Sequence, residues 1–350
     1  MIPSVISAGK PIPRTHSIHT PSMRNPFHLF HFLLAALGLL LAACTAEPTD
    51  AAPAASPNDQ PYVVLVTGDE EYRSEESMPM LARMLERELG VRTKVCYALD
   101  SAGYVNPNVN DNIVGLAALD SADLMVLFTR WRALPDDQAK HILDFAESGK
   151  PMVGFRTSTH AFLYKDDSLR QHLNNEWPTK VFGQQWITHH GHFEDGNAPL
   201  TAVSLIEEKG DHPILRGVEP MDAYSWLYHV DGGEWELYGD SDPLLTGRSL
   251  RSNHEEAGRL DEFPITNPVA WTKTYTGESG KAARVFFTTL GHPYDFKSPS
   301  MRRLALNGAA WAMGREENIP EGGHDPTIVG TYDPNNSGFG EKFKKGLRPE

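Results

Sequence analysis

Short apolar runs recur along the chain, and each has the length of a single buried strand. They cover residues 61–68, 92–97, 124–128, 152–155 and 283–290. A continuous apolar run of this length is typical of a strand whose two faces are both buried in a parallel sheet. Most of the runs end at a glycine or a polar turn, so each strand is predicted to stop there.

Between the strands, apolar residues spaced three and four positions apart predict helices. The predicted helices cover residues 77–89, 135–148 and 299–313, and a glycine follows each of them. Strands that alternate with helices imply right-handed crossover connections. The sequence therefore predicts a doubly wound, mostly parallel α/β sheet.

Two stretches break this rhythm. Residues 165–270 carry short apolar runs between Gly, Pro, Asn and Asp, which predicts a loop-rich, mainly β insertion. Residues 318–350 contain too few apolar groups to form a core alone. The folded domain is therefore predicted to span residues 61–317, followed by a C-terminal tail at 318–350.

The predicted topology gathers three loops on one rim of the sheet, because the carboxyl ends of parallel strands meet at one edge. These loops cover residues 67–76, 129–134 and 156–162. Ligands of α/β sheets bind at this edge. The third loop follows a strand abruptly with Arg156, Ser158, Thr159 and His160, which makes it the first place to look for chemistry.

The first 43 residues resemble a bacterial lipoprotein signal peptide. Three basic residues precede an apolar stretch at 29–43, and small residues stand directly before Cys44. Cleavage there would leave Cys44 as the lipidated N-terminus, and a cleaved but unlipidated signal is the alternative. Residues 44–60 predict a flexible tether. The protein is expected to be exported and lipid-anchored to the cell envelope, facing the periplasm or cell surface, with translation starting at Met1 or Met23.

Acidic residues outnumber basic ones, 46 to 32, for a formal net charge of −14. Removal of the predicted signal takes away three basic residues and no acidic ones, which lowers the charge to −17. Nucleic acid and anionic lipid surfaces are therefore disfavoured partners. Cys96 lies in a strand pattern and is predicted to be buried packing rather than a nucleophile.

Four separated stretches resemble the ThuA-like domain. They lie at residues 151–162, 211–217, 284–292 and 302–311, and the similarity covers about residues 61–315. The resemblance implies a class I glutamine amidotransferase-like fold, in a family associated with the use of trehalose and other sugars. The expected partner is a small carbohydrate.

The elbow after the fourth strand departs from true glutamine amidotransferases, whose turn reads Gly-x-Cys-x-Gly. The aligned stretch here runs from Gly154 to Ser158, and Arg156 replaces the thiol. A guanidinium is permanently protonated and cannot act as a nucleophile, so we expect no glutaminase activity.

Four residues are predicted to be catalytic. His160 and His292 each follow a predicted parallel strand, so both should reach the same rim, where imidazoles can transfer protons. A carboxylate from Asp69, Glu70 or Glu71 in the first loop could orient one imidazole or act as base, and Glu70 is the candidate named. Arg156 is expected to hold a carboxylate, an enolate or a keto oxygen. The alternative for each histidine is a packed or solvent-facing side chain.

Substrate contacts are predicted on the same loops and in the insertion. Trp131, Tyr164 and Trp186 offer flat apolar faces on which sugar rings can stack. Hydrogen bonds to ligand hydroxyls are predicted from Asp69, Ser158 and Thr159. Local capping is the alternative interpretation of Ser158 and Thr159.

A histidine cluster at residues 189–195 is a candidate metal site. In an extended segment His190, His192 and Glu194 share one face and supply ligands suited to Zn²⁺ or another divalent ion. The alternative is an exposed histidine-rich loop.

The sequence leaves three functions open. The first is a lipid-anchored lyase, isomerase or hydrolase that acts on a carbohydrate or keto-sugar by His-assisted proton transfer. The second is a non-catalytic sugar-binding or scaffolding lipoprotein, and the third is a metal-dependent hydrolase that uses the 189–195 cluster. Neither the sugar nor the oligomeric state follows from the sequence.

Overall fold

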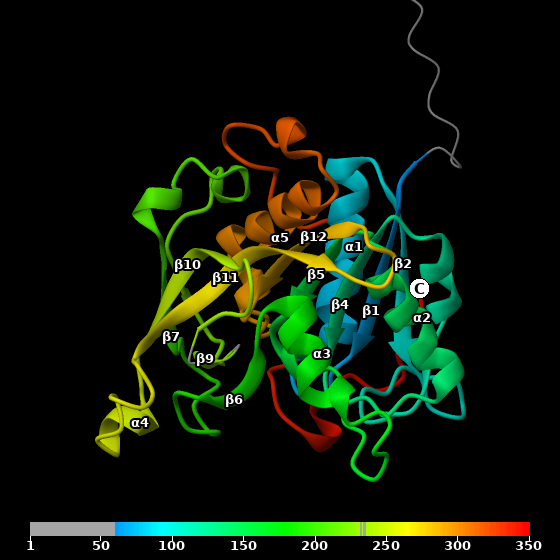
Figure 1. Ribbon diagram of the computed structural model, residues 1–350, viewed down its shortest axis with the longest axis horizontal. Helices are drawn as coiled ribbons and strands as arrows, with labels where there is room; N and C mark the ends of the chain where they lie inside the picture. The colour runs from blue at the N-terminus through cyan, green and yellow to red at the C-terminus, as the bar shows by residue number, and fades with distance from the viewer. Residues whose placement is uncertain (1–59, 232, 234–235) are drawn as a thin grey trace, which may run out of the picture. The chain divides into compact units, whose positions relative to one another are not determined.

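A large mixed sheet forms the centre of the protein (Figure 1). The computed structural model describes residues 60–231, 233 and 236–350, and within them ten strands pair in the order β3-β2-β1-β4-β5-β12-β11-β10-β7-β8. The parallel strands are β1 (Tyr62–Gly68), β2 (Arg92–Ala98), β4 (Leu124–Thr129), β5 (Met152–Phe155) and β12 (Ala282–Thr288). The prediction of a doubly wound, mostly parallel α/β core is confirmed.

The predicted β insertion extends this sheet with antiparallel strands. These are β7 (Thr201–Leu205), β8 (Met221–Ala223), β10 (Asp242–Ser249) and β11 (Thr266–Thr276), and β11 pairs with β12. At the opposite edge the short β3 (Ile113–Val114) pairs antiparallel with β2. A separate ribbon joins β6 (Gln185–His189) to β9 (Tyr228–Asp231), and a single turn of helix, α4 (Asn253–Glu256), precedes β11 in the sequence.

Helices cover both faces of the parallel strands. Side chains alternate along β1, so Val63 and Leu65 pack with α1 (Ser74–Leu89) and α5 (Pro299–Ala312). Val64 and Val66 face the other way, toward α2 (Asp136–Glu147) and α3 (His172–Phe182). Complete burial of one such aliphatic side chain contributes about 1.5–3 kcal/mol, so this alternation fixes which helix covers which face.

Two helices differ from the prediction. Helix α1 begins at Ser74, three residues before the expected start, so Pro79 lies inside it. Helix α3 was not predicted, because Asn174, Asn175 and Pro178 hide the helical spacing of its buried residues. Gly154 in β5 allows α3 to approach closely, since a Cβ there would lie 2.7 Å from the Phe182 ring.

The C-terminal segment 318–350 packs against the domain although it contains little regular structure. Ile328, Val329, Tyr332 and Leu347 contact the core on the α1 and α5 side. In Figure 1 the last part of this segment, in red, runs along the edge toward which the β1 and β4 arrowheads point. The tail therefore reaches the rim on which the site was predicted.

The predicted signal peptide, Cys44 and the tether up to residue 59 lie outside the described residues. Within the described part of the chain, no helix is both long enough and apolar enough to span a bilayer.

Candidate functional site

A cavity of about 170 Å³ opens at the carboxyl ends of the parallel strands. We call it the rim cavity. Loops after β1, β4 and β5, the β6–β9 ribbon and the C-terminal tail all contribute to it. Its lining residues are Glu71, Tyr72, Arg130, Trp131, His160, Trp186, His189, Phe193, Tyr228 and Phe339.

Backbone strain concentrates in the three loops behind this cavity. Among the described residues, three other than glycine have positive φ: Arg73 (57°), Trp131 (50°) and Arg156 (41°). They follow β1, β4 and β5 respectively. Such conformations cost about 1–3 kcal/mol and persist where the surroundings hold them, which is common at functional sites.

His160 lines the rim cavity and keeps one unprotonated ring nitrogen. The Thr159 hydroxyl donates its single proton to the Arg156 carbonyl at 3.1 Å. The contact of 3.1 Å between this hydroxyl and His160 Nδ1 therefore requires that Nδ1 carries the proton and donates it. Nε2 then keeps its lone pair. Burial, together with Arg130 and Arg156, holds the pKa of His160 well below its ordinary value, so the ring is neutral at neutral pH.

Glu71 is the carboxyl group of the cavity. Burial raises its pKa from 4.5 to about 7, although Arg130 opposes the shift from 3.3 Å. At neutral pH its protonated and ionised forms are therefore both populated, which suits a group that takes and returns a proton. The Arg130 guanidinium also lies 3.5 Å above the Trp131 ring.

Glu70, the predicted base, does not line the rim cavity. Its carboxylate pairs with Arg130 and, at 2.6 Å, with Arg132. Asp69 is fully buried and accepts hydrogen bonds from the Glu71 and Tyr72 amides and the Thr157 hydroxyl. The carboxylates of Asp69 and Glu70 therefore hold the first loop in shape. Glu71 lines the rim cavity, where Glu70 was expected.

Arg156 lies behind the cavity and does not line it. Its fully buried guanidinium donates to the Thr289 carbonyl at 2.9 Å and to the Tyr72 hydroxyl at 2.9 Å. The rings of Tyr72 and Tyr228 sandwich it at 4.1 and 4.4 Å. These bonds join the loops behind the cavity, and Arg156 Nε is left without a hydrogen-bond partner among the described residues. The contact of Arg156 with a ligand stays a prediction.

His292 is also separated from the rim cavity. Its Nδ1 accepts the Tyr294 amide proton at 3.1 Å, so Nε2 carries the ring proton and donates to Ser337 at 2.8 Å. Burial and Arg156 lower the pKa of His292 well below its ordinary value. The two predicted histidines therefore lie on one rim, but only His160 faces the cavity.

The other predicted contacts divide between the cavity and its surroundings. Trp131 and Trp186 flank His160, with ring centroids 5.8 and 5.2 Å from the imidazole. Trp186 Nε1 is buried and has no hydrogen-bond partner among the described residues. Ser158 is not available to a ligand, because its hydroxyl donates to the Leu127 carbonyl at 2.8 Å. Thr159 acts through His160, whose Nδ1 proton its hydroxyl accepts.

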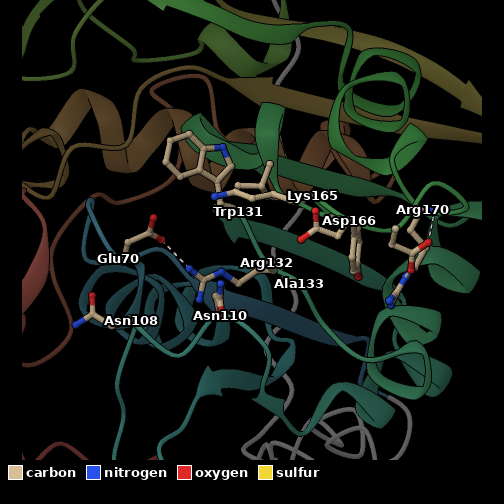
Figure 2. Close-up of a pocket in the computed structure, with 12 residues that line it drawn as sticks. Glu70, Asn108, Asn110, Trp131, Arg132, Ala133, Lys165, Asp166 and Arg170 are labelled. Carbon is tan, nitrogen blue, oxygen red and sulfur yellow. Dashed lines mark hydrogen bonds and ion pairs between the residues drawn. The ribbon is translucent and has the colours of Figure 1, made fainter.

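Tyr164 lines a different depression, which we call the polar groove. This groove of about 610 Å³ runs past Trp131 (Figure 2). The Tyr164 hydroxyl donates to the Leu134 carbonyl at 2.9 Å. Figure 2 shows the Glu70–Arg132 pair at one end of the groove and Asp166 and Arg170 toward the other. No histidine or cysteine is among its described lining residues, so the candidate chemistry lies in the rim cavity.

The predicted metal ligands are not assembled. His190 is buried against Ser252, at 2.7 Å, whereas His192 is exposed and pairs with Glu256 at 2.9 Å. Gly191 turns the chain with φ 94°, which ends the alternation on which the prediction rested. Glu194 lines a further hollow. Over residues 60–231, 233 and 236–350, no group of three His, Cys, Asp or Glu side chains could hold a metal ion.

Sequence reasoning missed His189, which lines the rim cavity. Its Nδ1 lies 3.2 Å from the His190 carbonyl and must donate to it, so Nε2 keeps a lone pair. Burial lowers the pKa of His189 to about 4. An irregular register between Trp186 and His189 brings both side chains to the cavity, which strict strand alternation would not predict.

The solved structures to which this chain is similar include two ThuA-like proteins. One, from Parabacteroides merdae, is 15% identical with a TM-score of 0.47, covering 82% of this chain and 100% of that chain. Another, from Bacteroides uniformis, is 14% identical with a TM-score of 0.46, covering 74% and 94%. An exo-beta-1,4-mannosidase from an Opitutaceae bacterium is 10% identical with a TM-score of 0.35, covering 72% of this chain and 36% of its own.

A comparison with curated proteins gives no match. The ThuA family, described as trehalose utilisation, matches residues 62–312. This range runs from β1 to the end of α5 and includes every strand of the central sheet that the structure describes. The chain therefore belongs to the ThuA family.

Proposed function

We propose that this ThuA protein binds a carbohydrate or keto-sugar in the rim cavity and transfers a proton on it. One observation carries the proposal: the neutral His160, with a free Nε2, and Glu71, with a pKa near 7, line the same aromatic cavity. A group is most effective in acid–base catalysis when its pKa lies near the working pH, so Glu71 is the group that exchanges the proton.

The neighbouring groups have distinct tasks in this proposal. His160 Nε2 accepts a hydrogen bond from a ligand hydroxyl and so orients the ring. The Arg130 guanidinium, 3.3 Å from Glu71, stabilises negative charge that develops on a keto oxygen when the adjacent carbon loses its proton to Glu71. Trp131 and Trp186 offer ring faces, and Trp186 Nε1 supplies a buried donor without a partner among the described residues.

Glutamine hydrolysis is not part of this proposal. The side chain at the nucleophile position, Arg156, is buried and engaged with the neighbouring loops. Cys96 is buried in β2, and burial raises its pKa to about 12. A thiol in that state is a poor nucleophile at neutral pH.

A sugar-binding protein without catalysis is the second candidate. The observation that favours it is the depressed pKa of both cavity imidazoles, since a ring that resists protonation accepts hydrogen bonds well but is a weak base. We also propose that the protein is exported and lipid-anchored, as the N-terminal sequence predicts. This location fits either candidate function.

The test is a screen of mono- and disaccharides and their keto derivatives for binding by calorimetry and for conversion by NMR. Wild type should convert at least one ligand that it binds, and Glu71→Gln should bind that ligand without converting it. Glu256→Gln, on the exposed surface, serves as the matched control. Conversion that survives Glu71→Gln would overturn the catalytic assignment, and binding without conversion by wild type would favour the binding protein.

A further inference from the structure

A second hollow adjoins the rim cavity, and the C-terminal tail forms one of its walls. We call this cavity of about 480 Å³ the tail hollow. It shares Glu71, Phe193 and Phe339 with the rim cavity. Ser337, Phe339 and Lys342 all lie beyond residue 312, where the family match ends. The part of the tail that reaches the proposed site therefore lies outside the residues that the family matches.

The tail is fixed in position at this point. The Gly338 amide donates to the Glu71 carbonyl at 2.8 Å, and the Arg73 guanidinium donates to the Gly338 carbonyl. The Asn336 amide group donates to Asn197 at 2.8 Å and to the Gly196 carbonyl at 3.1 Å. These bonds hold the tail between the β1 loop and residues 196–197, so the hollow exists before a ligand arrives.

Ser337 offers a free proton to this hollow. His292 Nε2 donates to Ser337 Oγ, so the Ser337 hydroxyl accepts there and keeps its own hydrogen. No hydrogen bond donated by this hydroxyl is present among the described residues. His292 thus acts as a positioning residue, because its donation to Ser337 Oγ leaves the hydroxyl proton available to a ligand in the hollow that Ser337 lines.

The lining suits an uncharged, hydroxylated group. Trp226, Phe193 and Phe339 provide aromatic faces, and Asn197 and Ser337 provide hydrogen-bonding groups. Carboxylates and the Lys342 ammonium are both present, so neither sign of ligand charge is favoured. Phe193 and Phe339, which are 71% and 47% exposed, stand between the two cavities.

We propose that the tail hollow is a second subsite, which binds a neutral hydroxylated unit attached to the ring in the rim cavity. Phe339 divides the two subsites, and Ser337 donates a hydrogen bond to the attached unit. This inference rests on the proposed function. In this proposal the C-terminal tail makes the protein prefer two-unit ligands to single rings. The bond that links the two units lies beside Glu71.

The test compares glucose and trehalose, and their keto derivatives, by calorimetry with the full chain. Wild type should bind the two-unit probe at least tenfold more tightly than the one-unit probe. Ser337→Ala should lower the affinity for the two-unit probe by about three- to tenfold and leave the affinity for the one-unit probe unchanged. Phe339→Ala should reduce the same preference without unfolding the domain, since Phe339 is 47% exposed and lies outside the core. Ser204→Ala, at the exposed position of β7, is the control.

The outcomes separate the two proposals. Equal effects of Ser337→Ala on both probes, or no effect on either, would overturn the second subsite and leave the rim cavity intact. A wild type that binds both probes with equal affinity would overturn it as well. If no probe binds to wild type, the proposed function fails, and the second subsite fails with it.

Discussion

At the scale of single residues, Glu71 determines the expected pH dependence of catalysis. Its ionised form must take the proton from the ligand, and its pKa is about 7. Activity should therefore fall as the pH drops through about 7. We expect Glu71→Gln to lower turnover by about 10²–10⁴-fold, the usual contribution of a general base, while affinity changes little. The pH–rate profile of wild type and single-turnover rates of the variant check this.

Glu71 also affects stability, with a defined sign. Its folded pKa, about 7, lies above the ordinary value of 4.5, so the folded protein holds more protons than the unfolded chain between these values. This contribution is complete below pH 4.5 and is lost as the pH rises through about 7. As the pH rises from about 5.5 to 8.5, the free energy of unfolding of wild type should fall by about 2 kcal/mol relative to that of Glu71→Gln. Urea unfolding at both pH values measures it, and parallel pH dependences would contradict the assignment.

His160 should remain neutral over the physiological range, with its proton on Nδ1. Burial is the main cause, and Arg130 adds to it, so Arg130→Gln should raise the pKa of His160 toward its ordinary value. Thr159→Val removes the group that accepts the Nδ1 proton and should shift the tautomer equilibrium. ¹⁵N NMR of labelled imidazoles distinguishes the tautomers. A His160 ring that titrates near pH 6.5 in wild type would contradict this prediction, because it would mean that water reaches the imidazole.

The sequence located His160, Trp131 and Trp186 by their places after strands and in the insertion, but it could not rank the acidic residues of the first loop. Glu70 and Glu71 are adjacent, and only the folded loop shows that Glu70 is held by Arg132 while Glu71 lines the cavity. Arg156 shows a second limit of the sequence. Its position after β5 was predicted correctly, but the carbonyl groups that occupy it come from distant residues such as Thr289.

At the scale of elements, Arg156 joins the loop after β5 to the loop after β12 and to the β9 region. Its guanidinium bonds Thr289 and Tyr72 and lies between two tyrosine rings. A lysine cannot reproduce this planar fork. We expect Arg156→Lys to lower the free energy of unfolding by about 2–4 kcal/mol, because buried acceptors lose their donors. Urea denaturation measures the loss.

Arg248→Lys provides the control for that experiment, since Arg248 is exposed on β10 and should change stability by less than about 0.5 kcal/mol. Equal stability of Arg156→Lys and wild type would mean that Arg156 does not clamp the loops. In that case its original assignment to the ligand would have to be reconsidered.

The parallel strands were predictable because each is a short, continuous apolar run that ends at turn residues, a pattern typical of a strand buried on both faces. The antiparallel extension was visible only as short runs, since strands such as β8 contain three residues. Helix α3 escaped notice because asparagines and Pro178 obscure its buried stripe. The position of the tail at the rim could not be predicted, because its contacts through Ser337 and Gly338 join residues that are distant in the sequence.

At the scale of the whole molecule, the N-terminal sequence predicts a tethered envelope protein. Cys44→Ala should abolish lipid attachment and release the protein from the membrane fraction, while the domain that begins near residue 61 remains folded. Fractionation after detergent-free lysis, with circular dichroism of the released protein, checks both parts. Membrane association that persists in the variant would contradict the lipoprotein prediction.

The polar groove, the rim cavity and the tail hollow lie close together around Glu70, Glu71 and Trp131, and they differ in volume and in lining residues. The polar groove is the largest, at about 610 Å³, whereas the rim cavity is about 170 Å³ but contains the two imidazoles and Glu71. The proposed function requires the reacting ring to lie in the smaller of these two.

A crystal structure of the Glu71→Gln variant with a bound keto-sugar tests that requirement most directly. We expect the sugar ring in the rim cavity, with one hydroxyl oxygen about 2.6–3.2 Å from His160 Nε2 and the keto oxygen facing Arg130. A sugar bound only in the polar groove beside Asp166 and Arg170, with the rim cavity unoccupied, would contradict the proposed function.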